Sequence, residues 1–185
     1  YGNINQETAT EGNTSITIRY EYETEEPYLG GFMTKKVIDT KDVNNVSSTI
    51  VYEMDYDTVH GWLTQLTVCS KPTQISVIPS CSDTPPSGDT IQYQYDNVGR
   101  ITKVINPDQT EFDIIYQLGP LLNTVTYRDE TGVEEKLTFN GLGYLEKEEI
   151  VGTNTWTLYE YDNYGRVVKL TDANNNKTTF TYDAW

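Results

Sequence analysis

The octads YQYDNVGR (residues 93–100) and YEYDNYGR (residues 159–166) determine the fold of this chain, and six of their eight positions are identical. Each octad ends a stretch in which apolar and polar residues alternate, which is typical of a strand that buries one face. Each then has Asp and Asn followed by Gly, which predicts a tight turn with Gly at positive φ. An octad therefore predicts the end of one strand, a turn and the start of the next strand.

The pattern recurs along the chain with a regular period. Aromatic markers follow one another every 21 to 23 residues, at Tyr95, Tyr116, Phe139, Tyr161 and Tyr182. A fixed period of this order is the signature of a repeat architecture in which each unit is one supersecondary element. Upstream, ITIRYEYE (16–23) and IVYEMDYD (50–57) continue the pattern at wider steps. The wider steps predict inserted loops at 24–46 and 69–90.

We therefore expect an all-β chain of consecutive antiparallel hairpins in one curved, spiralling sheet, with no helix longer than two turns. Alternation places Ile50, Tyr52, Met54 and Tyr56 on one strand face, which we expect to be the buried one. The expected strands are about 15–23, 49–57, 90–96, 100–105, 111–117, 121–128, 134–140, 144–151, 155–162, 166–171 and 177–183.

Composition narrows the range of partners. The net charge of −15 argues against nucleic acid, because little here could neutralise a phosphate backbone. Calcium or a basic partner surface remains open. No stretch approaches the roughly 20 apolar residues of a membrane span. The chain begins with Tyr1 rather than Met and ends within a repeat at 183–185, so we interpret it as one repeat segment (1–185) of a longer protein.

Few residues suggest chemistry. Cys69 and Cys81 could form a disulfide in a secreted protein, or remain two thiols in a reducing compartment. His60 is the sole histidine, so neither a metal site nor a base for a nucleophile is expected. DANNN (172–176) lacks the Gly and the terminal Glu of an EF-hand and is interpreted as an Asx turn. We expect no enzyme, no metal and no cofactor.

Two features of the octads have a structural and a functional interpretation. In Asp96/Arg100 and Asp162/Arg166 the guanidinium could lock the turn, or the pair could be an exposed ion pair of roughly 0–1 kcal/mol. The tyrosine ladder could bind sugar rings, but cross-strand packing of the rings is the more usual role.

The octads, the strand that follows them and the ending TTFTYDAW resemble the YD repeats of RHS proteins. Trp62 and Tyr144 stand where this motif has Arg, and Asn140 stands where it has Asp. The resemblance covers most of the chain. Its motif residues are Tyr93, Tyr95, Asp96, Gly99, Arg100, Tyr159, Tyr161, Asp162, Gly165, Arg166, Tyr182 and Asp183.

The resemblance implies a sheet of hairpins that forms a strip or part of a hollow shell. RHS proteins include secreted bacterial toxin components whose shell encloses a toxic segment, wall-associated proteins and adhesion receptors. The DPxG ending of the self-cleaving core motif does not occur in this sequence. We therefore expect a non-catalytic wall segment whose partners are the rest of its parent protein and an enclosed toxin. The alternative is a cell-surface module for adhesion or carbohydrate binding.

The free edges of such a sheet carry a further expectation. Unpaired edge strands and an aromatic face both favour association with another copy. The inserted loops could cover that face, and the negative charge should restrain association at low salt. We therefore expect self-association that increases with ionic strength.

Overall fold

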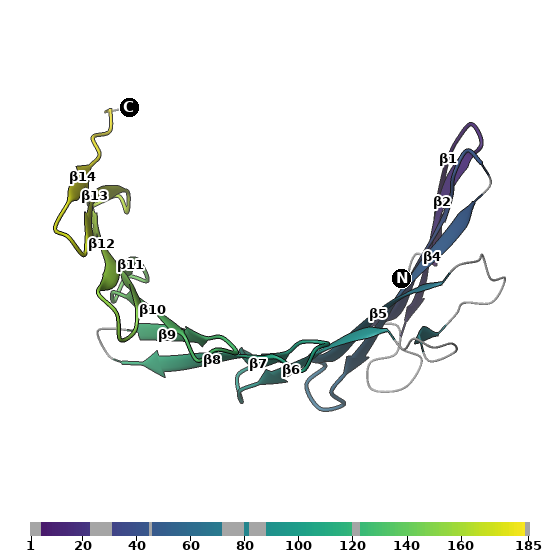
Figure 1. Cartoon of the computed structure of the whole chain (residues 1–185), viewed down its shortest axis with the longest axis horizontal. Coiled ribbons are helices and arrows are strands. Elements are labelled where there is room, and N and C mark those ends of the chain that lie inside the picture. Colours follow the sequence, from purple (N-terminus) through teal and green to yellow (C-terminus); the bar gives the residue numbers. More distant parts are fainter. Residues whose placement is uncertain are drawn as a thin grey trace. The chain divides into compact units, whose positions relative to one another are not determined.

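A computed structural model of the chain describes residues 5–22, 31–44, 46–71, 80–81, 88–119 and 123–183. Their regular structure consists of antiparallel β-strands that neighbour one another in chain order (Figure 1), and these residues form no α-helix. The all-β class of consecutive antiparallel hairpins is therefore confirmed. The strands are β1 (Gln6–Glu11), β2 (Thr14–Tyr22), β3 (Met33–Lys41), β4 (Ser47–Tyr56), β5 (Leu63–Lys71), β6 (Asp89–Tyr95), β7 (Ile101–Ile105), β8 (Glu111–Leu118), β9 (Asn123–Arg128), β10 (Glu134–Phe139), β11 (Leu145–Ile150), β12 (Thr155–Tyr161), β13 (Val167–Asp172) and β14 (Lys177–Thr179).

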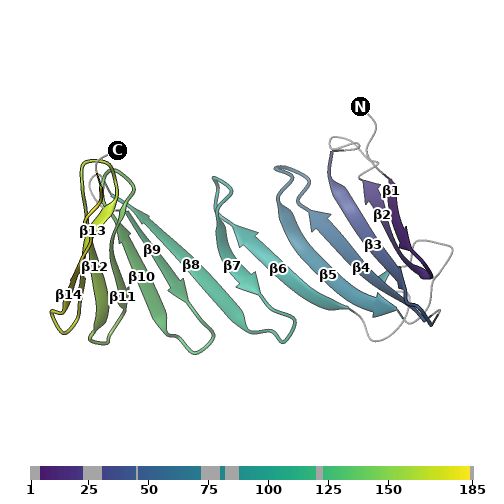
Figure 2. The ribbon, with the colours of Figure 1, turned by 90° about the horizontal axis from the view of Figure 1, so that it is seen from above.

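Contacts divide the chain into two units. The first comprises residues 1–99 and 105–109, and the second comprises residues 100–104 and 110–185. The first unit therefore holds β1 to β6, and the second holds most of β7 and all of β8 to β14. Within each unit, consecutive strands lie side by side and antiparallel (Figure 2).

All the strands expected from the repeat are found, the last of them shortened to Lys177–Thr179. The prediction that 24–46 is a loop is wrong, because residues 33–41 within it form β3. The prediction of a loop at 69–90 is also wrong at its start, since β5 extends to Lys71. Both strands lack the Tyr-Asp signature by which the others were recognised, and pairing with neighbours on both sides stabilises them. The edge strand considered near residues 74–78 lies outside the described residues.

The expected buried face of the first unit is also wrong. Val37 and Val51 are fully buried, and they face each other across β3 and β4. The side chain of Val51 points to the other face of β4 from those of Ile50 and Tyr52. These two side chains are only partly buried. The covered face is therefore the one that carries many of the charged residues of these strands.

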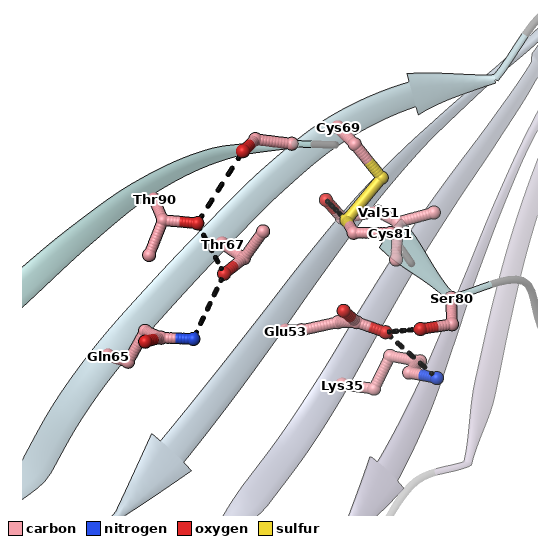
Figure 3. Close-up of a disulfide and its surroundings, with 10 residues drawn as sticks. Lys35, Val51, Glu53, Gln65, Thr67, Cys69, Ser80, Cys81 and Thr90 are labelled. Carbon is pink, nitrogen blue, oxygen red and sulfur yellow. Dashed lines mark hydrogen bonds and ion pairs between the residues drawn. A yellow bond between two sulfur atoms is a disulfide. The ribbon is translucent and has the colours of Figure 1, made fainter. Parts of the chain in front are cut away.

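A disulfide explains this inversion. Cys69, on β5 directly opposite Val51, is bonded to Cys81, which is 2% exposed (Figure 3). The bond holds Ser80 and Cys81 over β4, where the Ser80 hydroxyl donates to the Glu53 carboxylate at 2.7 Å. Ser80 and Cys81 thus lie over part of a face that the sequence pattern assigns to the surface.

The buried carboxylate of Asp39 is paired on this face. Asp39, 6% exposed, accepts hydrogen bonds from Arg19 at 2.7 Å and from the Thr49 hydroxyl at 2.6 Å. Burial of a charge is tolerated when it is paired and hydrogen-bonded in this way. The register of β2, β3 and β4 thus places one ion pair next to the buried valines.

Candidate functional site

The turns of the repeat are closed by an Asp or Asn side chain. In the 162–166 turn, Asp162 Oδ1 accepts hydrogen bonds from the backbone N–H groups of Tyr164 at 2.8 Å and Arg166 at 3.0 Å. In the 140–144 turn, the Asn140 amide oxygen accepts the equivalent pair at 3.0 and 3.1 Å. An amide therefore performs the same function as a carboxylate here, and Asn140 is a conservative departure from the motif.

The glycine of each turn adopts the left-handed conformation that the sequence predicts. Gly99 has φ 84° and Gly165 has φ 78°, so this prediction is confirmed. A type I turn followed by a left-handed residue produces a β-bulge in the hairpin. The register accordingly shifts between Glu160 and Tyr161, immediately before the turn. The marker tyrosine thus occupies the irregular position of its strand.

Turn closure also accounts for the acidic groups with low pKa values. At Asp129, the hydrogen bond from the Thr131 hydroxyl, helped by turn N–H groups, lowers the carboxyl pKa against the effect of desolvation. At Asp172, hydrogen bonds from the side chain and backbone of Asn176 lower the pKa. Both carboxylates serve the turns that they begin, and Asp172 confirms the interpretation of DANNN as an Asx turn.

The marker tyrosines tie each hairpin to the strand before it. The phenol hydroxyl donates to the carbonyl of the first residue of that strand, next to the bulge, where the ladder is interrupted. A buried carbonyl without a hydrogen-bond partner is costly, so the tyrosine hydroxyl stabilises the strand by pairing with it. The same hydrogen bond holds the tyrosine ring in place. The bonds are Tyr56 to Met33 (2.9 Å), Tyr95 to Leu63 (2.7 Å), Tyr116 to Ile101 (3.0 Å), Tyr161 to Leu145 (2.7 Å) and Tyr182 to Val167 (2.7 Å).

The residue just before each of those carbonyl groups stacks on the same tyrosine ring. It is Arg in the octads and an aromatic residue elsewhere, and both present a flat group to the ring. Trp62 and Tyr144, which depart from the motif in sequence, therefore preserve its contact. The pairs are Phe32 with Tyr56 (4.9 Å, rings tilted by 33°), Trp62 with Tyr95 (5.3 Å, rings tilted by 39°), Arg100 with Tyr116 (4.3 Å), Tyr144 with Tyr161 (5.0 Å) and Arg166 with Tyr182 (4.4 Å).

In two of these pairs the flat residue also covers the glycine of the next turn. A Cβ atom on Gly165 would lie 2.5 Å from the Tyr144 hydroxyl, and one on Gly99 would lie 3.1 Å from the Trp62 ring. Trp62 and Tyr144 therefore each pack against both the tyrosine and the glycine of the following hairpin. We call the contact between a flat residue and the marker tyrosine of the following hairpin the interlock.

Arg166 shows how the motif residues combine. Its Nε donates to Asp162 Oδ2 at 2.7 Å within its own turn, while its guanidinium lies over Tyr182 of the next repeat. The locked turn and the link between repeats are thus made by one side chain. In the other octad, Asp96 Oδ1 accepts from the Val98 N–H at 3.0 Å and Arg100 stacks on Tyr116.

The remaining motif residues lie beside the interlock. Tyr93 and Tyr159 precede the marker tyrosines by two positions and share their strand face. Burial raises the pKa of Tyr159 to about 12, and a hydrogen bond with Glu148 acts in the same direction. Asp183 directly follows Tyr182. The sequence showed these positions but not the interlock, whose signal is an Arg or aromatic residue directly after Gly31, Gly61, Gly99, Gly143 and Gly165.

His60 belongs to a turn. Its ring stacks on Trp62 at 4.1 Å, and its Nδ1 lies 3.4 Å from the carboxylate of Asp57. In the part of the chain that the structure describes, no three His, Cys, Asp or Glu side chains are grouped to hold a metal ion. Those residues also contain no helix that is long and apolar enough to cross a membrane.

Comparison with known proteins gives a family match and structural neighbours. The RHS repeat family model matches residues 82–111 and 161–185. No curated protein matches the sequence. One solved structure, the Tc holotoxin pore of Photorhabdus luminescens with a mutated TccC3, is similar over 86% of this chain at 11% identity and a TM-score of 0.49. A second, TcdB2–TccC3 without its hypervariable C-terminal region, covers 89% of this chain at 15% identity and a TM-score of 0.32.

This chain spans about a tenth of the length of those neighbours, at 10% and 9%. The two family-matched stretches contain one whole octad, 93–100, and all but the first two residues of the other. The same stretches contain the Asx turns that begin at Asp162 and Asp172 and the contact of Arg166 with Tyr182. On this sequence and family evidence, the chain carries RHS repeats at residues 82–111 and 161–185.

Proposed function

We propose that this chain is a non-catalytic wall segment of a larger, secreted bacterial RHS-repeat protein, and that the wall encloses a toxic polypeptide. The observation that carries the proposal is the interlock, which makes each hairpin dependent on the next. In repeat proteins of this kind, stability is the sum of the units and the contacts between neighbours. Such a construction extends by adding hairpins and suits a wall.

The disulfide supports the secreted location. Bonds such as Cys69–Cys81 form and persist in oxidising compartments and are rare where thiols are kept reduced. Here the bond also holds Cys81 against Val51, one of the buried valines of the first unit.

The uses of the conspicuous side chains support a structural rather than a catalytic or sugar-binding role. The acids with lowered pKa values begin turns, where they cap N–H groups. The marker tyrosines already use their hydroxyl and one ring face within the sheet, as Tyr161 does with Leu145 and Tyr144. The carbohydrate-binding alternative therefore gains no support from the tyrosine ladder.

Limited proteolysis of the full-length protein tests the proposal. We expect the polypeptide downstream of the repeats to resist protease in the intact protein. Replacing Tyr144 and Arg166 by Ala should weaken two interlocks and make that polypeptide more sensitive. Digestion of the downstream polypeptide at the same rate with and without the repeat region would contradict an enclosing wall. Binding to a glycan array without any protection would favour the adhesion alternative.

A further inference from the structure

The strands of the second unit separate their charges between the two faces of the sheet. Pairing places Ile114, Tyr127, Glu135 and Ile150 in one cross-strand row. The next row on the same face includes Glu148, between Leu137 and Thr157. We call this the aromatic face of the second unit. On β8 to β13 its charged strand residues are acids.

The opposite face carries the cations of these strands, and most of them are paired there. Arg128 lies 2.5 Å from Glu134, Lys147 lies 2.5 Å from Glu149, and Lys169 pairs with Glu160. Lys136 shares this face, opposite Glu149. That surface is close to electrically balanced, as a solvated face usually is.

The carboxylates of the aromatic face have no such balance. Among the described side chains, neither Glu135 nor Glu148 makes an ion pair, and the hydrogen-bond partner of Glu148 is the neutral phenol of Tyr159. Two negative charges therefore lie among aromatic and aliphatic side chains, and no strand residue of their own face on β8 to β13 is a cation. Arg100 reaches this face from a turn and lies over the Tyr116 ring.

A hollow of about 420 Å³ opens beside Glu135. Its apolar walls are the rings of Phe112 and Tyr127, stacked at 5.8 Å, with Val133 and Ile150. Asp129 also borders the hollow, but its Oδ1 already accepts hydrogen bonds from its own turn. Ring faces and a carboxylate together suit a cation on an apolar stem, such as a Lys or Arg side chain.

We propose that the aromatic face of the second unit binds an extended basic polypeptide segment. One cationic side chain enters the hollow and meets Glu135, and the cation two residues along meets Glu148. These glutamates are diagonal neighbours on adjacent strands, about 7 Å apart. Residues i and i+2 of an extended chain are also separated by about 7 Å and point the same way. The segment recognised is thus of the type Lys/Arg-x-Lys/Arg.

The proposal rests on the proposed function only for the source of this segment, which would be the enclosed polypeptide. The spacing and charge of the face apply to any basic segment. The two ideas can therefore fail separately. If the downstream polypeptide is protected but basic peptides do not bind, the wall stands and its contents are recognised by other chemistry.

Fluorescence anisotropy with the whole 185-residue chain tests the binding. The probe is a labelled synthetic peptide that alternates Lys and Thr, and its counterpart alternates Glu and Thr. The test variant is Glu135→Gln with Glu148→Gln. The matched control is Glu134→Gln with Glu149→Gln, which changes the net charge by the same two units on the opposite face. Circular dichroism verifies that both variants are folded.

We expect the Lys peptide to bind, the Glu peptide not to bind, and the test variant to bind the Lys peptide about tenfold more weakly. The control variant should stay within about twofold of the unaltered chain, because distant surface charge contributes little at moderate salt. Equal weakening in both variants would mean non-specific attraction to a negative protein and would overturn the proposal. Failure of the Lys peptide to bind the unaltered chain would overturn it as well.

Discussion

Substituting Ala for Gly165 tests the interlock directly, and Gly143 provides an internal control. Both glycines occupy the same position of an Asx turn, at φ 78° and 83°. Around Gly143 an added Cβ would meet nothing within 4 Å, whereas at Gly165 it would lie 2.5 Å from the Tyr144 hydroxyl and 2.8 Å from the ring carbon that bears it. The two substitutions therefore share a backbone cost and differ in a side-chain clash.

The shared cost is that of placing an L-residue in left-handed space, roughly 1–2 kcal/mol. At Gly165 the Tyr144 ring must also move, which disturbs its stacking on Tyr161, worth about 0.5–1.5 kcal/mol. We therefore expect Gly143→Ala to lower the free energy of unfolding by roughly 1–2 kcal/mol. Gly165→Ala should lower it by about 1 kcal/mol more.

Urea denaturation of the two variants measures this difference. A double-mutant cycle with Tyr144→Ala isolates the clash, since without the ring Gly165→Ala should cost only its backbone term. A coupling of about 1 kcal/mol between Gly165 and Tyr144 would support the interlock. Equal costs at both glycines, together with no coupling to Tyr144, would refute the reasoning.

Four further predictions follow from the structure. Asp129→Asn should keep its turn at neutral pH but make the free energy of unfolding depend less on pH in acid. The lowered carboxyl pKa of Asp129 stabilises the fold above the ordinary carboxyl range, and this stabilisation is lost as the pH falls through the folded-state pKa. Acid unfolding that is the same in the variant would count against this prediction. In a spectrophotometric titration one tyrosine should ionise near pH 12, and Tyr159→Phe should remove that step. The raised pKa of Tyr159 stabilises the fold below the ordinary tyrosine range, and this stabilisation is lost as the pH rises towards 12. Replacing both members of Cys69–Cys81 by Ser should cost roughly 2–3 kcal/mol, and a loss below about 0.5 would show that the cover holds without the bond. Light scattering should show self-association that grows with salt, and a strict monomer at low and high salt would contradict it.

The strands that were predicted and those that were missed show how much a local sequence pattern can predict. The Tyr-Asp signature and the turn residues are short-range, so the strands next to them could be read from sequence. β3 (Met33–Lys41) has three Lys residues and no such signature, and its strand state depends on partners at Val51 and Arg19 that are distant in the chain. β5 was missed for the same reason.

The class of the fold, the repeat register and the left-handed glycines could be predicted from the sequence, because each follows from residues within one hairpin. Tertiary structure alone decided which face of the first unit is covered, since that depends on a bond between Cys69 and Cys81 across an insertion. It also decided that Arg166, Tyr144 and Trp62 are equivalent. Side chains so different in charge share a role because each lays a flat group on a tyrosine of the next repeat. That tyrosine is 16 to 33 residues away in sequence, and only the paired strands bring the two together.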